Sequence, residues 1–254
     1  MRYALLLLSA AFFGFAPSLA RAADAPTATF SDTQRAEIEN IVKEYLTKKN
    51  PEVMIDAMKE LQNRQNADAA VKSKAALSSS HDKIFNDPNS PVGGNPKGNV
   101  TVVEFFDYQC GYCKMTEPGV QKLLKEDRDV KFIYKDFPIL GPMSVEAAKA
   151  SLASVKQGKY IQFHDALMSI KDHLSEDLLF KAAKDAGLDV DKLKKVMNDE
   201  AIGKMVDANV TLGESIGARG TPTFVVGDQI YPGAMQYEQL KKSVDDARAA
   251  AKKQ

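Results

Sequence analysis

The stretch VVEFFDYQCGYCKMTEPG, residues 102–119, decides the fold of this chain. It holds both cysteines of the 254-residue sequence, Cys110 and Cys113, separated by Gly111 and Tyr112. The run of β-branched and aromatic residues at 100–106 predicts a buried strand, and the residues after Cys113 repeat their apolar positions at helical spacing. The cysteine pair is therefore expected at a junction where a strand ends and a helix begins.

That junction suits redox chemistry. A C-x-x-C pair next to a strand–helix unit is a thioredoxin-like signature. At the start of the helix, unpaired N–H groups and the positive end of the helix dipole would face the Cys110 sulfur and favour its thiolate. The thiolate is the nucleophile in disulfide exchange. Cys113, one helical turn further on, could resolve a mixed disulfide formed at Cys110.

Two other residues fit such a site. Glu104 is a carboxylate inside an otherwise apolar strand, where burial would raise its pKa and let it carry protons to and from Cys113. Pro222 follows Thr221 at the start of a later strand, and a cis bond there would turn Thr221 toward the active site. The alternatives are a Glu104 that points to solvent at a strand edge and an ordinary trans proline.

The N-terminus predicts export. Arg2, the apolar run at 4–16 and the small-residue pattern at 20–22 are typical of a signal peptide over residues 1–22. The apolar run is shorter than the roughly 20 residues of a membrane anchor, which is the alternative. The near-balance of charge, 34 basic and 34 acidic residues, gives no reason to expect nucleic acid as a partner. An exported chain can keep a disulfide, but one pair closing so small a loop is a weak staple.

Residues 23–85 predict an N-terminal helical arm with a linker. Ser31 and Gln34 fit a capping box, and Pro51 fits the start of a second helix. Both helices carry an apolar stripe, whereas residues 62–84 are polar and alanine-rich, with little to pack against. We therefore expect this arm to associate with copies of itself and the connector at 62–84 to be mobile; the alternative is a helical decoration of a monomer.

Residues 86–254 predict an α/β catalytic domain. The breaker-rich loop at 86–99 marks its start, and strands are expected at 100–106 and 130–140. Every periodic stretch between about 141 and 217 is helical, which predicts an inserted all-helical subdomain. Two short strands and a final helix from about residue 236 complete the pattern.

In this order and context, Glu104, Cys110-Gly111-Tyr112-Cys113 and Thr221-Pro222 resemble the Dsb family of periplasmic thiol–disulfide oxidoreductases. The resemblance implies a thioredoxin fold with a helical insertion. It also implies that Cys110 is the nucleophile, Cys113 the resolving cysteine, Glu104 the buried acid and Pro222 a cis proline opposite the pair.

Within that family the layout is similar to the suppressor of copper sensitivity C group, in which an N-terminal stalk makes a homotrimer. Gly111-Tyr112 and Thr221 look like the disulfide isomerase branch, but the all-helical insertion looks like the oxidase. The arm at 31–84 matches that group in character rather than by motif.

We therefore expect a periplasmic disulfide isomerase or reductase that acts through Cys110 on wrong disulfides of exported proteins. The expected partners are these clients, an inner-membrane thiol reductase and further copies of the chain, as a trimer rather than a dimer. The alternatives are a dithiol oxidase and, in a different class, a copper(I)-binding protein that uses Cys110 and Cys113. No cofactor is expected. A zinc site is excluded because it needs four ligands, and His81, His164 and His173 lack metal-site spacing to the pair; His164 is expected at a helix surface or in packing.

Overall fold

The computed structural model describes residues 30–252, and contacts divide the chain into one unit that ends at Leu61 and another that begins at Gln62. The expected signal peptide, residues 1–22, lies outside the described residues. Within 30–252, no helix combines the length and the apolar character that crossing a membrane requires.

The first unit is helical. It contains α1 (Asp32–Glu44), the π-helical turn η1 (Tyr45–Lys49) and the beginning of α2 (Glu52–Ser79). The predicted capping box at Ser31 and Gln34 is confirmed by both of its hydrogen bonds. None of the residues of α1 is buried. Most of the large apolar side chains of this unit are 39% to 69% exposed: Phe30, Ile38, Ile41, Val42, Tyr45, Val53, Met54, Ile55, Met58 and Leu61.

The second unit is built on a five-stranded sheet with the order β1-β3-β2-β4-β5. The strands are β1 (Val92–Gly94), β2 (Val100–Phe106), β3 (Val130–Asp136), β4 (Thr223–Val226) and β5 (Gln229–Pro232). β2 runs parallel to β3 and antiparallel to β4, so β2 lies in the middle of the sheet. This mixed sheet around a central strand confirms the predicted thioredoxin-type α/β fold.

Side chains of β2 alternate between the two faces of the sheet, as the pleat of a strand requires. Val102 and Phe106 belong to the core that α4 (Gly111–Glu126) and α10 (Tyr237–Ala251) cover. Val103 and Phe105 belong to a second core on the opposite face. Because the alternation places Glu104 on the same face as Val102 and Phe106, the carboxylate lies on the side of the sheet that carries α4.

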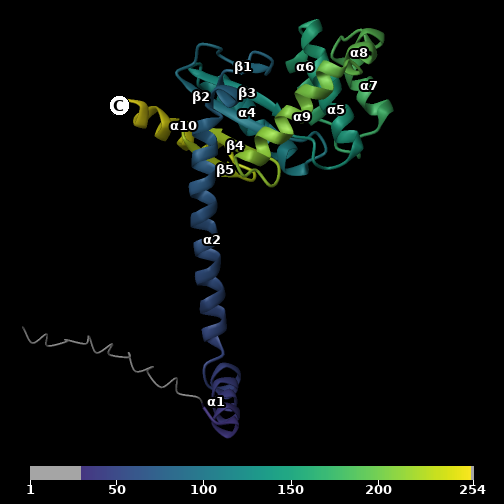
Figure 1. Cartoon of the computed structure of the whole chain (residues 1–254). Helices are drawn as coiled ribbons and strands as arrows, with labels where there is room; N and C mark the ends of the chain where they lie inside the picture. The colour runs from purple at the N-terminus through teal and green to yellow at the C-terminus, as the bar shows by residue number, and fades with distance from the viewer. Residues whose placement is uncertain (1–29, 253–254) are drawn as a thin grey trace, which may run out of the picture. The chain divides into compact units, whose positions relative to one another are not determined.

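The helical insertion agrees with the predicted range. It comprises α5 (Pro142–Ser154), the short 3₁₀ turn η2 (Val155–Gln157), α6 (Tyr160–Met168), α7 (Glu176–Asp185), α8 (Val190–Met197) and α9 (Glu200–Ser215). Within the second unit, helices α5 to α9 gather beside the sheet (Figure 1). α9 also contributes Leu212 to the core on the second face of the sheet.

Residues 62–85 depart from the sequence expectation. The end of α2 and the short helix α3 (His81–Phe85) pack into the second unit, and Leu77, Ile84 and Phe85 are buried in its core. A side chain at Gly217 would collide with Ser73, so the last turns of α2 lie close to the segment before β4. The expectation that this stretch has little to pack against is therefore wrong for its final part. The sequence did contain a signal for this packing, namely the few apolar residues near the end of α2 and in α3.

Candidate active site

Cys110 is the N-cap residue of α4 and immediately precedes the helix. Its backbone is extended (φ −75°, ψ 115°), and its own N–H donates to the carbonyl oxygen of Asp107 at 3.0 Å. Gly111 is the first residue of the helix, so the free N–H groups of the first turn face the Cys110 sulfur. The predicted strand–helix junction is confirmed, and with it the electropositive surroundings of the first cysteine.

The two thiols differ strongly in acidity. Hydrogen bonding with the Cys113 thiol, with Thr221 and with the backbone N–H groups of Cys113 and Tyr112 outweighs partial burial and lowers the pKa of Cys110 to about 6. Burial, the hydrogen bond with Cys110 and the charge of Glu104 raise the pKa of the Cys113 thiol far above its usual range. Cys110 is thus the thiolate at neutral pH, and Cys113 is the protonated partner.

Glu104 lies in the interior of the sheet and not at a strand edge. Its side chain is 1% exposed, and one carboxylate oxygen, Oε2, has no hydrogen-bond partner among the described residues. Burial, followed by the charges of Glu117 and Cys110, raises the pKa of Glu104 well above its usual value. Burial in these surroundings disfavours the charged carboxylate, so Glu104 binds a proton more readily than an exposed glutamate and can exchange it with a nearby group.

Thr221 and Pro222 meet the cysteine pair from the opposite side. The peptide bond between them is cis, as predicted. The carbonyl oxygen of Thr221 accepts a hydrogen bond from the Cys110 sulfur at 3.2 Å. Pro222 directly precedes β4, where Thr223 pairs with Phe105 of β2. The sheet therefore brings Thr221-Pro222 to Glu104 and the two cysteines, although more than a hundred residues separate Cys110 from Thr221 along the chain.

Asp107 is a site residue that the sequence analysis missed. Its buried carboxylate accepts N–H bonds from Gln109 at 2.8 Å, from Ile139 at 2.9 Å and from Leu140 at 3.0 Å. It thereby ties the loop after β3 to the turn that carries Cys110. That loop exposes the side chains of Ile139 and Leu140. An acidic residue between a strand and the cysteine pair was the available signal.

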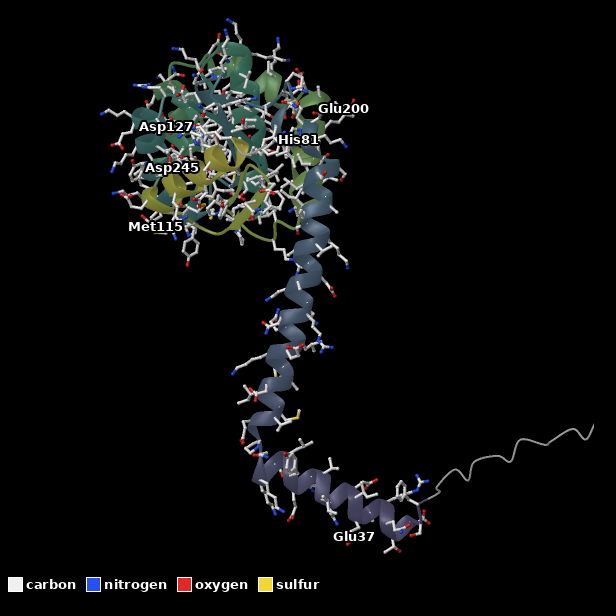
Figure 2. All side chains as sticks on the ribbon, turned by 90° about the vertical axis from the view of Figure 1, so that its left-hand side faces the viewer. Glu37, His81, Met115, Asp127, Glu200 and Asp245 are labelled. Carbon is white, nitrogen blue, oxygen red and sulfur yellow. The ribbon has the colours of Figure 1, made fainter. Side chains whose placement is uncertain are left out.

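Apolar side chains also surround the pair on α4. Tyr112 is 65% exposed and Met115 is 50% exposed. Met115 lies at the surface of the second unit, at its lower edge in Figure 2. Together with Ile139 and Leu140, these residues give the surroundings of Cys110 an apolar surface that a polypeptide segment can contact.

His164 is not at a helix surface. It is fully buried, and its ring nitrogens face the hydroxyl of Tyr108 at 3.0 Å and the carboxylate of Glu117 at 3.4 Å. Of the two expected places for His164, the one in packing is correct. The sequence analysis did not foresee that both ring nitrogens have hydrogen-bond partners. As for metals, the cysteine pair offers two thiol sulfurs and the described part of the chain adds no third cysteine to them.

Comparisons with known proteins agree with this geometry. The description "DSBA-like thioredoxin domain" matches residues 101–245, and "Copper resistance protein ScsC N-terminal domain" matches residues 34–67. A crystal structure of a thioredoxin-like oxidoreductase from Silicibacter pomeroyi is 43% identical, with a TM-score of 0.65, over 66% of this chain and 97% of that one. A linker-deletion form of Proteus mirabilis ScsC is 30% identical, with a TM-score of 0.66, over 88% of this chain and 99% of that one.

Among curated relatives, Disulfide bond formation protein D of Bacillus subtilis is 28% identical over 61% of this chain and 75% of its own length. Na(+)/H(+) antiporter NhaA 3 of Salinispora tropica is 31% identical over 63% of this chain. The chain spans only a quarter of the length of that antiporter and of a second one from Salinispora arenicola. The match to the family description covers more than half of the chain. It shows that the chain belongs to the DSBA-like thioredoxin-domain family and carries a ScsC N-terminal domain.

Proposed function

We propose that this protein is an exported disulfide isomerase or reductase that works as a homo-oligomer, with a trimer favoured over a dimer. The observation that carries the proposal is the exposed apolar surface of the first unit, Ile41 and Met58 among its residues. Isolated helices with such a surface are unstable in water unless they pack against a partner. Several copies joined there would surround one client with several active sites.

The proposed catalytic roles follow from the acidity of the two thiols. The Cys110 thiolate attacks a client disulfide, and a mixed disulfide between Cys110 and the client forms. A client thiolate resolves it when the disulfide is rearranged, or Cys113 resolves it when the client is reduced. Glu104 takes up and returns the proton of Cys113 during that step. Thr221 and Pro222 hold the client chain opposite Cys110.

The cellular setting and the electron source are part of the same proposal. A thioredoxin-like relative from Salmonella enterica, 32% identical to this chain, is described as periplasmic. Export to that compartment would give the protein oxidised clients to repair. A reductase of the inner membrane would then be needed to return the pair to its dithiol form.

The second candidate is a dithiol oxidase that donates the Cys110–Cys113 disulfide. One observation favours it: a thiolate as stable as that of Cys110, with a pKa of about 6, stabilises the reduced form and makes the disulfide more oxidising. Two relatives have names that point the same way, Disulfide bond formation protein D of Bacillus subtilis and the thiol-disulfide exchange protein alpha-DsbA2 of Wolbachia pipientis.

The test is rescue of a scrambled multi-disulfide substrate by the reduced chain. We expect rescue by the unaltered chain, and none by Cys110→Ser. The double variant Ile41→Lys/Met58→Lys should run as a monomer in light scattering and should lose rescue while still exchanging thiols with a small disulfide. Glu37→Lys, which changes a charge on the same α1 helix, is the matched control and should keep the oligomer.

Three results would argue otherwise. Rescue that survives Cys110→Ser would exclude the proposed nucleophile. A chain that rescues nothing but rapidly oxidises a reduced substrate when pre-oxidised would be the oxidase. A stoichiometric, tight Cu(I) complex at Cys110 and Cys113 without any catalysis of thiol exchange would favour copper binding as the primary role.

A further inference from the structure

A buried polar cluster lies beside the catalytic helix, on the side that faces the helical insertion. Glu117 follows Cys113 by four residues on α4, so the two side chains share one face of that helix. Glu117 is 9% exposed, although an ionised carboxylate is rarely buried without a partner. The roles expected for Cys110, Cys113 and Glu104 do not explain why an acidic residue occupies position 117.

The partner is His164 of α6. Its fully buried ring lies with Nδ1 3.0 Å from the Tyr108 hydroxyl and Nε2 3.4 Å from Oε2 of Glu117. The Tyr108 hydroxyl in turn lies 2.6 Å from the hydroxyl of Ser151 on α5. Because a carboxylate only accepts hydrogen bonds, the network assigns a proton to Nε2 on the side of Glu117. His164 thus lowers the pKa of Glu117, against the effect of burial, and holds it as a carboxylate.

The side chains of this cluster hydrogen bond with one another and do not form a metal site. Ligand atoms of Glu117, His164 and Asp165 lie within 4.8 Å of one another. However, the amide nitrogen of Gln121 donates to Glu117 at 2.7 Å and to Asp165 at 3.0 Å. A donor placed between two carboxylates repels a cation, and both nitrogens of His164 already have partners. The arrangement therefore stabilises a negative charge on Glu117.

Glu104 lies next to this cluster: it pairs with Tyr134 of β3, and the Tyr134 ring lies 4.6 Å from the ring of His164. After burial, the charge of Glu117 is the largest cause of the raised pKa of Glu104, ahead of the charge of Cys110. Two other titratable groups face Glu104. They are Cys113 of α4 and Tyr134 of β3, which is the register partner of Glu104. The titratable groups around Glu117 are Tyr108, Tyr134, His164 and Asp165. Among these titratable groups, Glu117 is the carboxylate that His164 contacts and keeps ionised.

We infer that Tyr108, His164 and Glu117 are positioning residues for the proton on Glu104. Tyr108 orients His164, His164 holds Glu117 as a carboxylate, and that charge keeps the proton on Glu104 until Cys113 takes it. The inference rests on the proposed role of Glu104 as the proton carrier.

The step that this proton serves is balanced as follows. A client thiolate attacks the Cys110 sulfur of the Cys110–Cys113 disulfide, and the new client–Cys110 disulfide forms as the old bond breaks. The electron pair of the broken bond remains on the Cys113 sulfur. That thiolate takes the proton of Glu104 and leaves a carboxylate behind. The reverse sequence returns the proton to Glu104 when Cys113 resolves a mixed disulfide.

The experiment is a carbon-13 titration of the full-length reduced protein with labelled glutamate carboxyls, in which Glu104→Gln identifies the Glu104 signal. Glu117→Gln should lower the titration midpoint of Glu104 by about one pH unit, a tenfold change in its proton affinity. The pH profile of resolution by Cys113 should shift in the same direction. Glu126→Gln removes the same charge from an exposed position of α4 and should leave the midpoint unchanged.

A second variant tests the role of the histidine. In His164→Gln, Glu117 keeps a neutral donor but loses the imidazole, so its own signal should titrate at higher pH than in the unaltered chain. An unmoved Glu104 midpoint in folded Glu117→Gln, or an unmoved Glu117 signal in folded His164→Gln, would overturn the inference. If Glu104→Gln exchanged thiols at the normal rate, the proposed role of Glu104 would fail instead, whatever its titration midpoint.

Discussion

The carbonyl oxygen of Thr221 lies 3.2 Å from the sulfur of Cys110, and the peptide bond that follows this carbonyl is cis. This contact joins the start of α4 to the start of β4, which are adjacent because β4 pairs with β2. A client that forms a mixed disulfide with Cys110 must approach past Thr221. The cis peptide therefore places the Thr221 backbone beside the nucleophile, on the route by which a client reaches it.

Alkylation of the reduced protein should report the acidity of Cys110 directly. Because the hydrogen bonds around the sulfur lower its pKa to about 6, the rate of reaction with iodoacetamide should rise with a midpoint near that pH. Thr221→Val should move the midpoint upward, since one of the hydrogen bonds that lower the pKa comes from the Thr221 side chain, which valine lacks. A midpoint near the ordinary value for cysteine would contradict the electropositive site.

The same shift predicts a pH-dependent stability of the reduced form. A group with a lowered pKa in the folded state stabilises the fold above its unfolded pKa and loses that effect as pH falls through the folded value. The stability advantage of the reduced protein over Cys110→Ser should therefore grow between about pH 6 and pH 9. Urea unfolding at pH 6 and pH 8 measures this difference, and an advantage that shrinks over this range would refute it.

Glu104→Gln should stabilise the protein at neutral pH and slow its chemistry. The folded pKa of Glu104 is raised, so the wild-type carboxyl contributes fully below its unfolded pKa near 4.5 and loses stability as pH rises above it. The glutamine has no such loss, and the gain should be on the order of 1–3 kcal/mol at pH 7. Denaturant midpoints at pH 4 and pH 7.5 check this, and equal gains at both would speak against a buried, protonated Glu104.

Asp107→Ala should destabilise the protein and weaken its action on protein clients. The substitution leaves the N–H groups of Gln109, Ile139 and Leu140 without their acceptor, at a cost of roughly 2–5 kcal/mol in the free energy of unfolding. Chemical denaturation provides the measurement. Asp129→Ala removes an exposed aspartate and serves as the control, with an expected change within about 0.5 kcal/mol.

Truncation should distinguish the two parts of the N-terminal segment. A chain that starts at Gln62 keeps Leu77, Ile84 and Phe85 and should retain a cooperative thermal transition. A chain that starts at residue 86 loses these three buried side chains, and each is worth about 2–5 kcal/mol. We expect it to melt at a much lower temperature or not to fold. Equal melting temperatures would show that α3 and the end of α2 contribute nothing.

The sequence by itself determined the class of the fold and the main chemical groups of the site. β2 and α4 are encoded by short-range periodicity, and Cys110 and Cys113 are neighbours along the chain, so their junction is a local property. Glu104 was recognisable because a carboxylate among apolar strand residues is costly unless it has a role. The helical insertion was equally local, since each of its helices carries its own stripe.

The tertiary structure alone decided the contacts between distant segments. The packing of Leu77 and Ile84 depends on a sheet face that only the folded strands create. Likewise, the bonds of Asp107 to the loop after β3, and of His164 to Tyr108 and Glu117, join residues that lie 32 to 56 positions apart. Hydrogen bonds between such segments leave no periodic trace in a sequence, because a polar residue that folding will bury and pair looks the same beforehand as one that will remain in water.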